Sequence, residues 1–211
     1  MDLPTMRSSV RRDLHDETGP NYRWTDDELD RHIQRAVNEV SAAALRERKA
    51  ALNTAADSRD LSLASLTDLV AVEAVEYPTG LYPPSYVRYS LWAGTLSLLV
   101  DAPPKGVESV NVYYGALHTL NATTSTLPAE TEDLVAMGAS AYAALEWANF
   151  AINRINVGGE EVWRQYLAWG QDRLAAYLEA LRKIARANAI RPRSLYVPAH
   201  PRSSQTTDAG P

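Results

Sequence analysis

The chain contains no cysteine and only one phenylalanine. Without cysteine it has no disulfide framework, no thiolate metal site and no cysteine nucleophile. No apolar run approaches the ~18 residues that a membrane-spanning helix needs, and the opening stretch MDLPTMRSSVRRD lacks the apolar core of a signal peptide. We therefore expect no membrane partner and a product that remains in the compartment where it is made.

The sequence also lacks the short motifs of the common enzyme classes. It has no serine nucleophile elbow, no phosphate-cradling glycine loop and no dinucleotide fingerprint. His32 and His118 have no second ligand at the i, i+4 spacing that zinc-binding helices use. The sequence therefore predicts that the protein is not an enzyme and holds no metal or cofactor.

Two groups of carboxylates are the remaining candidates for chemistry. The first contains Asp13, His15, Asp16 and Glu17, whose side chains diverge at helical spacing, so we interpret them as solvated surface. The second pairs Asp101 with Glu108 across a loop, where turn and solubility roles are a sufficient explanation.

Charge is unevenly distributed along the 211 residues, whose 45% hydrophobic and 22% charged content is typical of a folded protein. The net charge is -5, but residues 182–211 contain six basic side chains and one acidic side chain. An acidic body argues against a protein that grips phosphates, because nucleic-acid binders need clustered Lys and Arg. It is compatible with a channel wall along which DNA slides.

The stretch RRDLHDETGPNYRWTDDELDRHIQRAVNEVS, residues 11–41, reads as a helix, a turn and a second helix. Thr25 and Glu28 form a capping-box pattern, and the acidic residues after Thr25 suit the positive end of a helix dipole. The sequence predicts a second helix from this point, with apolar residues at helical spacing, and a first helix from about Thr5 to Glu17.

Between residues 61 and 120 the pattern changes to alternation, with β-branched and aromatic residues punctuated by Pro and Gly. We predict four strands, at residues 69–77, 86–91, 95–100 and 109–114. Because four strands bury little alone, we expect the sheet to pack on the helices or on a neighbouring subunit.

Two long helices are predicted after the strands. Pro128 suits the first turn of a helix that extends to the Gly158-Gly159 pair, and another helix runs from about Glu160 to Ala187. The fold class is therefore α+β: a bundle of about four helices with a small antiparallel β insertion between the second and third. The predicted segments are 1–52 (helical pair), 60–120 (β insertion), 126–187 (helical hairpin) and 188–211 (extended arm).

The candidate interaction residues are aromatic or lie in the C-terminal arm. Tyr and Trp combine an apolar body with a polar tip that suits interfaces. We predict a subunit or neck interface in the β region, with packing inside the protein core as an equal alternative, at Tyr82, Tyr86, Tyr89, Trp92, Tyr113 and Tyr114. The arm contains three consecutive apolar residues, Leu195, Tyr196 and Val197, and basic residues beside them, including Arg191 and Arg193. We expect this segment to become ordered when it binds a partner.

The order DLHDE, YRWTDDELDRHI and RAVNEVS resembles the head-tail connector, or adaptor, proteins of tailed bacteriophages, which are head-completion proteins that dock on the portal. The resemblance extends through AVEAVEYPTGLYPPSYVRYSLWAG and STLPAE, and covers about three quarters of the chain. It implies a structural virion protein that forms a homo-oligomeric ring, a dodecamer, beneath the portal. Such a ring extends the DNA channel, offers a platform to a downstream neck or tail protein, and assembles in the host cytoplasm. The arm would then be the portal-docking segment.

Two alternatives remain open at this point. One is a tail-completion or tail-terminator component, which would share ring assembly but prefer the tail tube. The other, from a different class, is a carbohydrate-binding or enzymatic module that uses the aromatic β region with Asp101 or Glu108.

Overall fold

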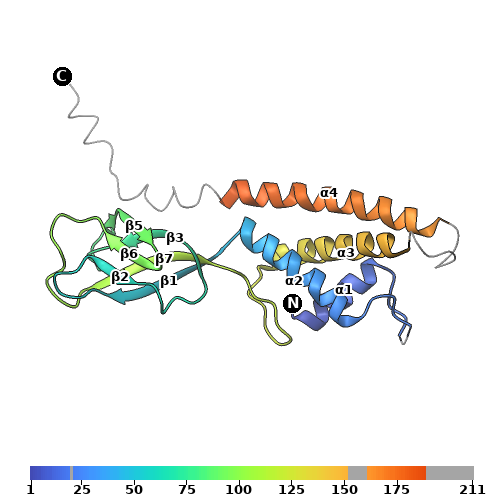
Figure 1. Cartoon of the computed structure of the whole chain (residues 1–211), viewed down its shortest axis with the longest axis horizontal. Helices are drawn as coiled ribbons and strands as arrows, with labels where there is room; N and C mark the ends of the chain where they lie inside the picture. Colours follow the sequence, from blue (N-terminus) through green and yellow to red (C-terminus); the bar gives the residue numbers. More distant parts are fainter. Residues whose placement is uncertain (20, 152–160, 189–211) are drawn as a thin grey trace, which may run out of the picture. The chain divides into compact units, whose positions relative to one another are not determined.

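The computed structural model describes residues 1–19, 21–151 and 161–188. It confirms the α+β class, with antiparallel sheets inserted between the second and third helices (Figure 1). The helices are α1 (Leu3–Asp13), α2 (Asp26–Ala43), α3 (Ala129–Ala151) and α4 (Val162–Asn188). The strands are β1 (Arg46–Asn53), β2 (Asp60–Ser62), β3 (Leu69–Glu76), β4 (Tyr86–Val87), β5 (Tyr89–Trp92), β6 (Thr95–Leu98) and β7 (Ser109–Ala116). Within the described ranges, no helix is both long and apolar enough to cross a membrane.

The described residues separate into two compact units. The helical unit contains Met1–Ala44 and His118–Arg186, and the β unit is built on Leu45–Leu117. Each unit has a hydrophobic core of its own.

The predicted capping box at the start of α2 is present. The Glu28 backbone N–H donates to Thr25 Oγ1 at 3.3 Å, and the Thr25 backbone N–H donates to Glu28 Oε2 at 2.7 Å. Two backbone donors that the helix leaves unpaired are thereby satisfied. The apolar face of α2 is buried as predicted, including Leu29, Ile33 and Val37.

The connection from α1 to α2 differs from the sequence expectation. α1 ends at Asp13, not near Glu17, and His15 follows in the left-handed region with a φ of 53°. The chain therefore turns back, and Asp16 is buried against Arg11, with 2.8 Å between Arg11 Nη1 and Asp16 Oδ2. The reading of Asp16 as solvated surface is wrong, because it assumed that helical spacing continued beyond Asp13.

Helix α3 occupies the centre of the helical unit, where small side chains allow its neighbours to approach. Ala139, Ala143 and Ala144 are fully buried. Gly138 contacts the ring of Tyr177 on α4, and Gly170 on α4 contacts Leu145 on α3. Since residue numbers rise along one helix as they fall along the other, α3 and α4 are antiparallel, as predicted (Figure 1).

The β unit contains two sheets, with strand orders β1-β7-β3-β4 and β2-β6-β5. Its core contains Leu61, Leu63, Val75, Leu96, Leu98, Val110 and Val112, so strands from both sheets supply one apolar cluster. The β region therefore contains two sheets that cover each other, not the single four-stranded sheet that the sequence predicted. Strands β1 and β2 were not predicted from the sequence, and β2 contributes Leu61 to this cluster.

Candidate interaction surfaces

The predicted portal-docking residues Arg191, Arg193, Leu195, Tyr196 and Val197 lie outside the described residues. Their role stays a prediction. The candidate surfaces described below therefore come from the β unit and the helical unit.

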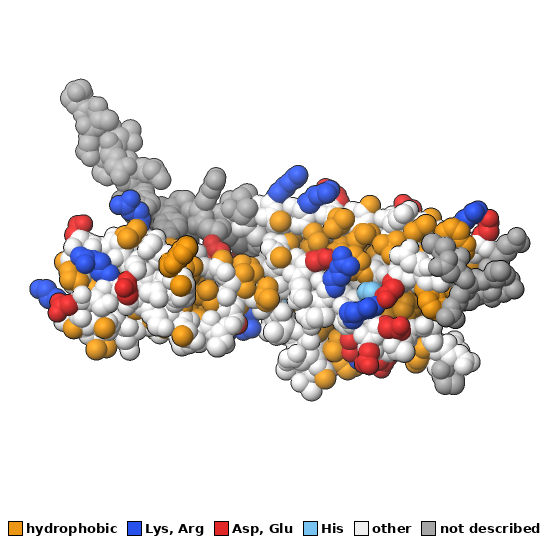
Figure 2. Space-filling model, viewed as in Figure 1, with side chains coloured by type: hydrophobic (Ala, Val, Ile, Leu, Met, Phe, Trp, Pro, Cys, Tyr) orange, Lys and Arg blue, Asp and Glu red, His pale blue; other side chains and the backbone are white. Residues whose placement is uncertain are grey.

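The six aromatic residues predicted as one interface differ in exposure, and their role at an interface stays a prediction. Tyr82 is 99% exposed and Trp92 is 84% exposed, whereas Tyr114 is buried. Tyr86, Tyr89 and Tyr113 are half-buried. Figure 2 shows hydrophobic side chains among charged ones on the visible face of the β unit. Tyr82 and Trp92 are the most exposed members of the set.

Tyr82 lies in the loop formed by residues 77–85, which we call the Tyr82 loop. The Tyr77 backbone N–H donates to the Ser85 carbonyl at 2.9 Å and closes the loop. The Tyr77 hydroxyl donates to Glu108 Oε2 at 2.7 Å, and this bond ties the base of the loop to the residue before β7. The exposed tip, with Leu81 at 53% and Tyr82 at 99%, is therefore held from its base.

The carboxylate of Glu76 supports the same loop from the end of β3. It is 5% exposed and accepts hydrogen bonds from Asn111 Nδ2 at 2.9 Å and from the Tyr113 hydroxyl at 2.8 Å. The Gly80 backbone N–H, inside the loop, donates to its other oxygen at 3.4 Å. Burial and the bond to Glu76 raise the pKa of Tyr113 to about 12, so this hydroxyl remains a donor at neutral pH.

Burial opposes ionisation of Glu76, but the bonds from Asn111 and Tyr113 outweigh it, and its pKa is lower than the ordinary value of 4.5. A carboxyl with a depressed folded-state pKa contributes stability above its unfolded pKa, and loses it as the pH falls through the folded value. We expect the difference in unfolding free energy between the wild type and Glu76→Gln to be largest near neutral pH and to shrink below about pH 4.5. Urea unfolding at several pH values measures this difference, and a gap that stays constant down to pH 2 would contradict the prediction.

Trp92 borders a groove near the opposite end of β3, which we call the Trp92 groove. It has a volume of about 570 Å³. Its lining comes from the chain between the end of β2 and the start of β3 and from the β5–β6 hairpin. It consists of Ser62, Leu63, Ala64, Leu66, Leu69, Leu91, Trp92, Ala93, Gly94 and Thr95. Ala93 and Gly94 both have positive φ, at 47° and 75°, as a tight two-residue turn between β5 and β6 requires. The Trp92 side chain before this turn is exposed. None of these lining residues is charged.

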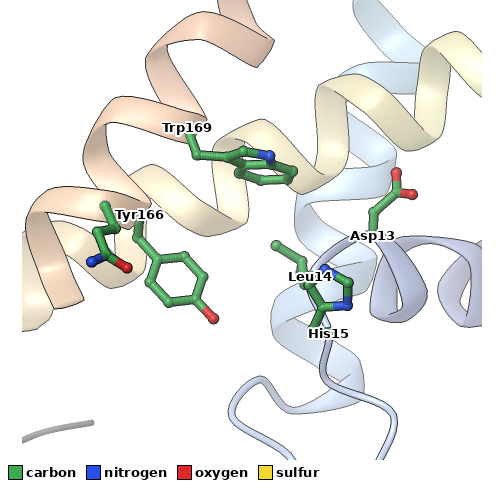
Figure 3. Close-up of a pocket in the computed structure, with 6 residues that line it drawn as sticks. Asp13, Leu14, His15, Tyr166 and Trp169 are labelled. Atoms are coloured by element: carbon green, nitrogen blue, oxygen red, sulfur yellow. The ribbon is translucent and has the colours of Figure 1, made fainter. Parts of the chain in front are cut away.

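A second cavity, of about 320 Å³, lies in the helical unit between the end of α1 and α4. Tyr166 and Trp169 from α4 lie on one side of it, and Asp13, Leu14 and His15 on the other (Figure 3). Asp13 forms an ion pair with Arg173, whose guanidinium lies 5.0 Å from the centre of the Trp169 ring. The carboxylate is thus already engaged within the chain, and these contacts hold α4 against α1.

The other candidates for chemistry are explained by local contacts. The two Glu108 oxygens accept from Tyr77 and from the Lys105 backbone N–H. His118 is buried, with 2.7 Å between its Nδ1 and the Thr126 carbonyl. Asp101 is exposed. In the part of the chain that the structure describes, no three His, Asp or Glu side chains are arranged to hold a metal ion.

The aliphatic part of both surfaces was not predicted from the sequence. Leu81 beside Tyr82, and Leu66, Leu69 and Leu91 beside Trp92, were not selected, because apolar residues in a β region are interpreted as core by default. One usable signal was present: LYPP and LWAG place an apolar pair directly beside turn residues, where a side chain is most often exposed.

No protein-family model matches the chain, and no curated protein matches it. Among solved structures, the chain is similar to one from the neck of an empty GTA particle, computed with C6 symmetry. The sequence identity is 15% and the TM-score is 0.28, and the similarity covers 79% of this chain and 87% of that chain. The likeness is distant.

Proposed function

We propose that this protein is a structural component of a phage neck: a head-to-tail adaptor that forms a ring under the portal and binds without catalysis. The ring, of twelve subunits, extends the DNA channel and provides the platform for the tail. The protein acts in the virion, between capsid and tail, after assembly in the host cytoplasm.

The observation that carries the proposal is the exposure of Tyr82 and Trp92 on a β unit that already has a complete core. Tyr and Trp are enriched at protein interfaces, so we infer that these two highly exposed side chains are contact points. The resemblance of residues 11–41 to phage connectors selects the kind of assembly.

Charge supports the channel part of the proposal. Helices α2 and α3 together contain nine acidic and two basic side chains, and α4 contains five basic and two acidic ones. Tight DNA binding through counterion release needs clustered basic side chains, and α2 and α3 are acidic. A channel wall must avoid such tight binding so that DNA can slide. In this proposal, the basic end of α4 and the arginines that follow it in the sequence bind the portal.

The test is native mass spectrometry of the purified chain mixed with portal rings from the same source. We expect a defined ring-sized mass increment on the portal, and its loss when residues 189–211 are deleted. Binding that survives this deletion would refute the arm assignment but not the adaptor role. Absence of portal binding at every salt concentration, with binding to tail tubes instead, would replace the adaptor with a tail-completion component.

A further inference from the structure

The Tyr82 loop and the Trp92 groove lie at opposite ends of strand β3. The loop begins directly after Glu76, where β3 ends, and the groove is lined by Leu69, where β3 begins. Strand β4 pairs back on β3 through Glu76 and Tyr86, so the loop is the tip of a hairpin that projects beyond the strand end. An eight-residue strand spans roughly 23 Å at about 3.3 Å per residue. The loop of one copy therefore does not reach the groove of the same copy.

The two features match chemically. The loop sequence YPTGLYPPS has no charged residue, and neither does the groove lining. Contact between them removes no charge from water, so the electrostatic match is that of two neutral apolar surfaces. The tip of the loop exposes Leu81 and Tyr82, and the groove is lined by leucines beside Trp92, so contact between them would bury apolar side chains on both sides.

The loop is also organised before it binds. The bonds from Tyr77 to Ser85 and Glu108, and from Gly80 to Glu76, hold its base in the isolated subunit. A held loop needs less ordering on association than a free one, and exposed Tyr and Trp side chains are the types that contribute most at interfaces.

We propose that the Tyr82 loop of one copy inserts into the Trp92 groove of the next copy. Such a contact uses different surfaces on the two partners, so it is heterologous and repeats head to tail until a ring closes. The proposal rests on the proposed function, since it assigns the contact between neighbouring subunits of the proposed ring.

The absence of cysteine makes a direct test possible. One copy carries Tyr82→Cys, and a second carries Ala64→Cys, at an exposed position in the groove lining. The two are mixed on portal rings and oxidised mildly. We expect a disulfide-linked pair in the mixture but not from either variant alone, and a ladder of linked subunits when both changes are in one chain. The control replaces Ala64→Cys with Val107→Cys, which is 79% exposed but does not line the groove.

A binding measurement accompanies the cross-link. We expect Tyr82→Ser and Trp92→Ser each to weaken association between subunits by about tenfold or more, and Val107→Ser to leave it unchanged. A ring that forms on the portal without the cross-link, and with both serine variants assembling normally, would overturn this contact and leave the adaptor role intact. Loss of only a tail-side protein in Trp92→Ser would also overturn the contact, because the groove then has a different occupant. Failure of any ring to form would overturn both proposals.

Discussion

Asp16→Ala is expected to lower the unfolding free energy of the helical unit by about 2–4 kcal/mol, because it removes the buried one of the two carboxylates that pair with the Arg11 guanidinium and leaves only the more exposed Asp26. The side chains of Arg11 and Asp16 are 7% and 9% exposed. Asp16 also accepts from the backbone N–H groups of Arg23 at 2.7 Å and Trp24 at 3.3 Å, and both would lose this acceptor. The loss is a large fraction of the about 5–15 kcal/mol that stabilises a typical domain.

The adjacent pair provides a matched control. Arg12 and Glu17 approach to 3.7 Å, but their side chains are 75% and 59% exposed. We expect Glu17→Ala to change stability by less than about 0.5 kcal/mol, since exposed ion pairs contribute little. Urea unfolding followed by tryptophan fluorescence reports on this unit, because Trp24 and Trp147 are buried in its core. Equal effects of Asp16→Ala and Glu17→Ala would show that the buried Arg11–Asp16 ion pair does not stabilise the helical unit.

Gly138→Ala is expected to destabilise the same unit by about 1–3 kcal/mol, although alanine is the better helix former by about 1 kcal/mol. An added Cβ would lie 2.7 Å from two atoms of the Tyr177 ring. Tyr177 is fully buried, and its hydroxyl donates to the Ala36 carbonyl at 3.3 Å, so the ring has no room to move. Burial also raises the pKa of Tyr177, which therefore remains a neutral donor.

Two further variants distinguish this clash from a general effect of glycine. Gly170→Ala would meet the half-buried side chain of Leu145 at 3.0 Å, which can shift, so we expect a smaller loss. In a double-mutant cycle, Tyr177→Leu should cost less in the Gly138→Ala background than in the wild type, because it removes the clashing ring. Additive effects in the urea midpoints would show that the ring contact is not the cause.

Features that depend on neighbours in the sequence were predictable. The capping box needs only Thr25 and Glu28, three residues apart, and both of its bonds are present. The Leu96 and Leu98 alternation was also predictable, because strand residues alternate between faces. Local chemistry specifies these features without knowledge of the rest of the fold.

Features that depend on distant partners were not predictable. Strand β1, with the sequence RERKAALN, has charged and alanine residues that disfavour strands, and it forms because all eight residues pair with β7, from Arg46–Ala116 to Asn53–Ser109. Adjacent residues Tyr113 and Tyr114 differ for the same reason. Alternation predicts that they face opposite ways, but only the completed unit determines that Tyr114 is buried and that Tyr113 bonds to Glu76.

Sequence patterns likewise do not predict which aromatic side chains of the β unit are exposed. Trp92 and Tyr89 belong to the same short strand, yet the Tyr89 hydroxyl donates to the Val72 carbonyl at 2.6 Å whereas Trp92 projects into solvent. Their sequence context is equally aromatic. Which of them is available to a partner depends on the position of β3, which no local pattern encodes.

The most direct test of the central claim is electron cryomicroscopy of intact particles that contain this protein. The adaptor account predicts a closed ring between portal and tail, into which the helical unit and the β unit each fit, with the Tyr82 loop of every subunit in density continuous with the Trp92 groove of its neighbour. Density for this chain at the tail end of the particle, or a neck in which no ring accommodates the four helices, would contradict the account.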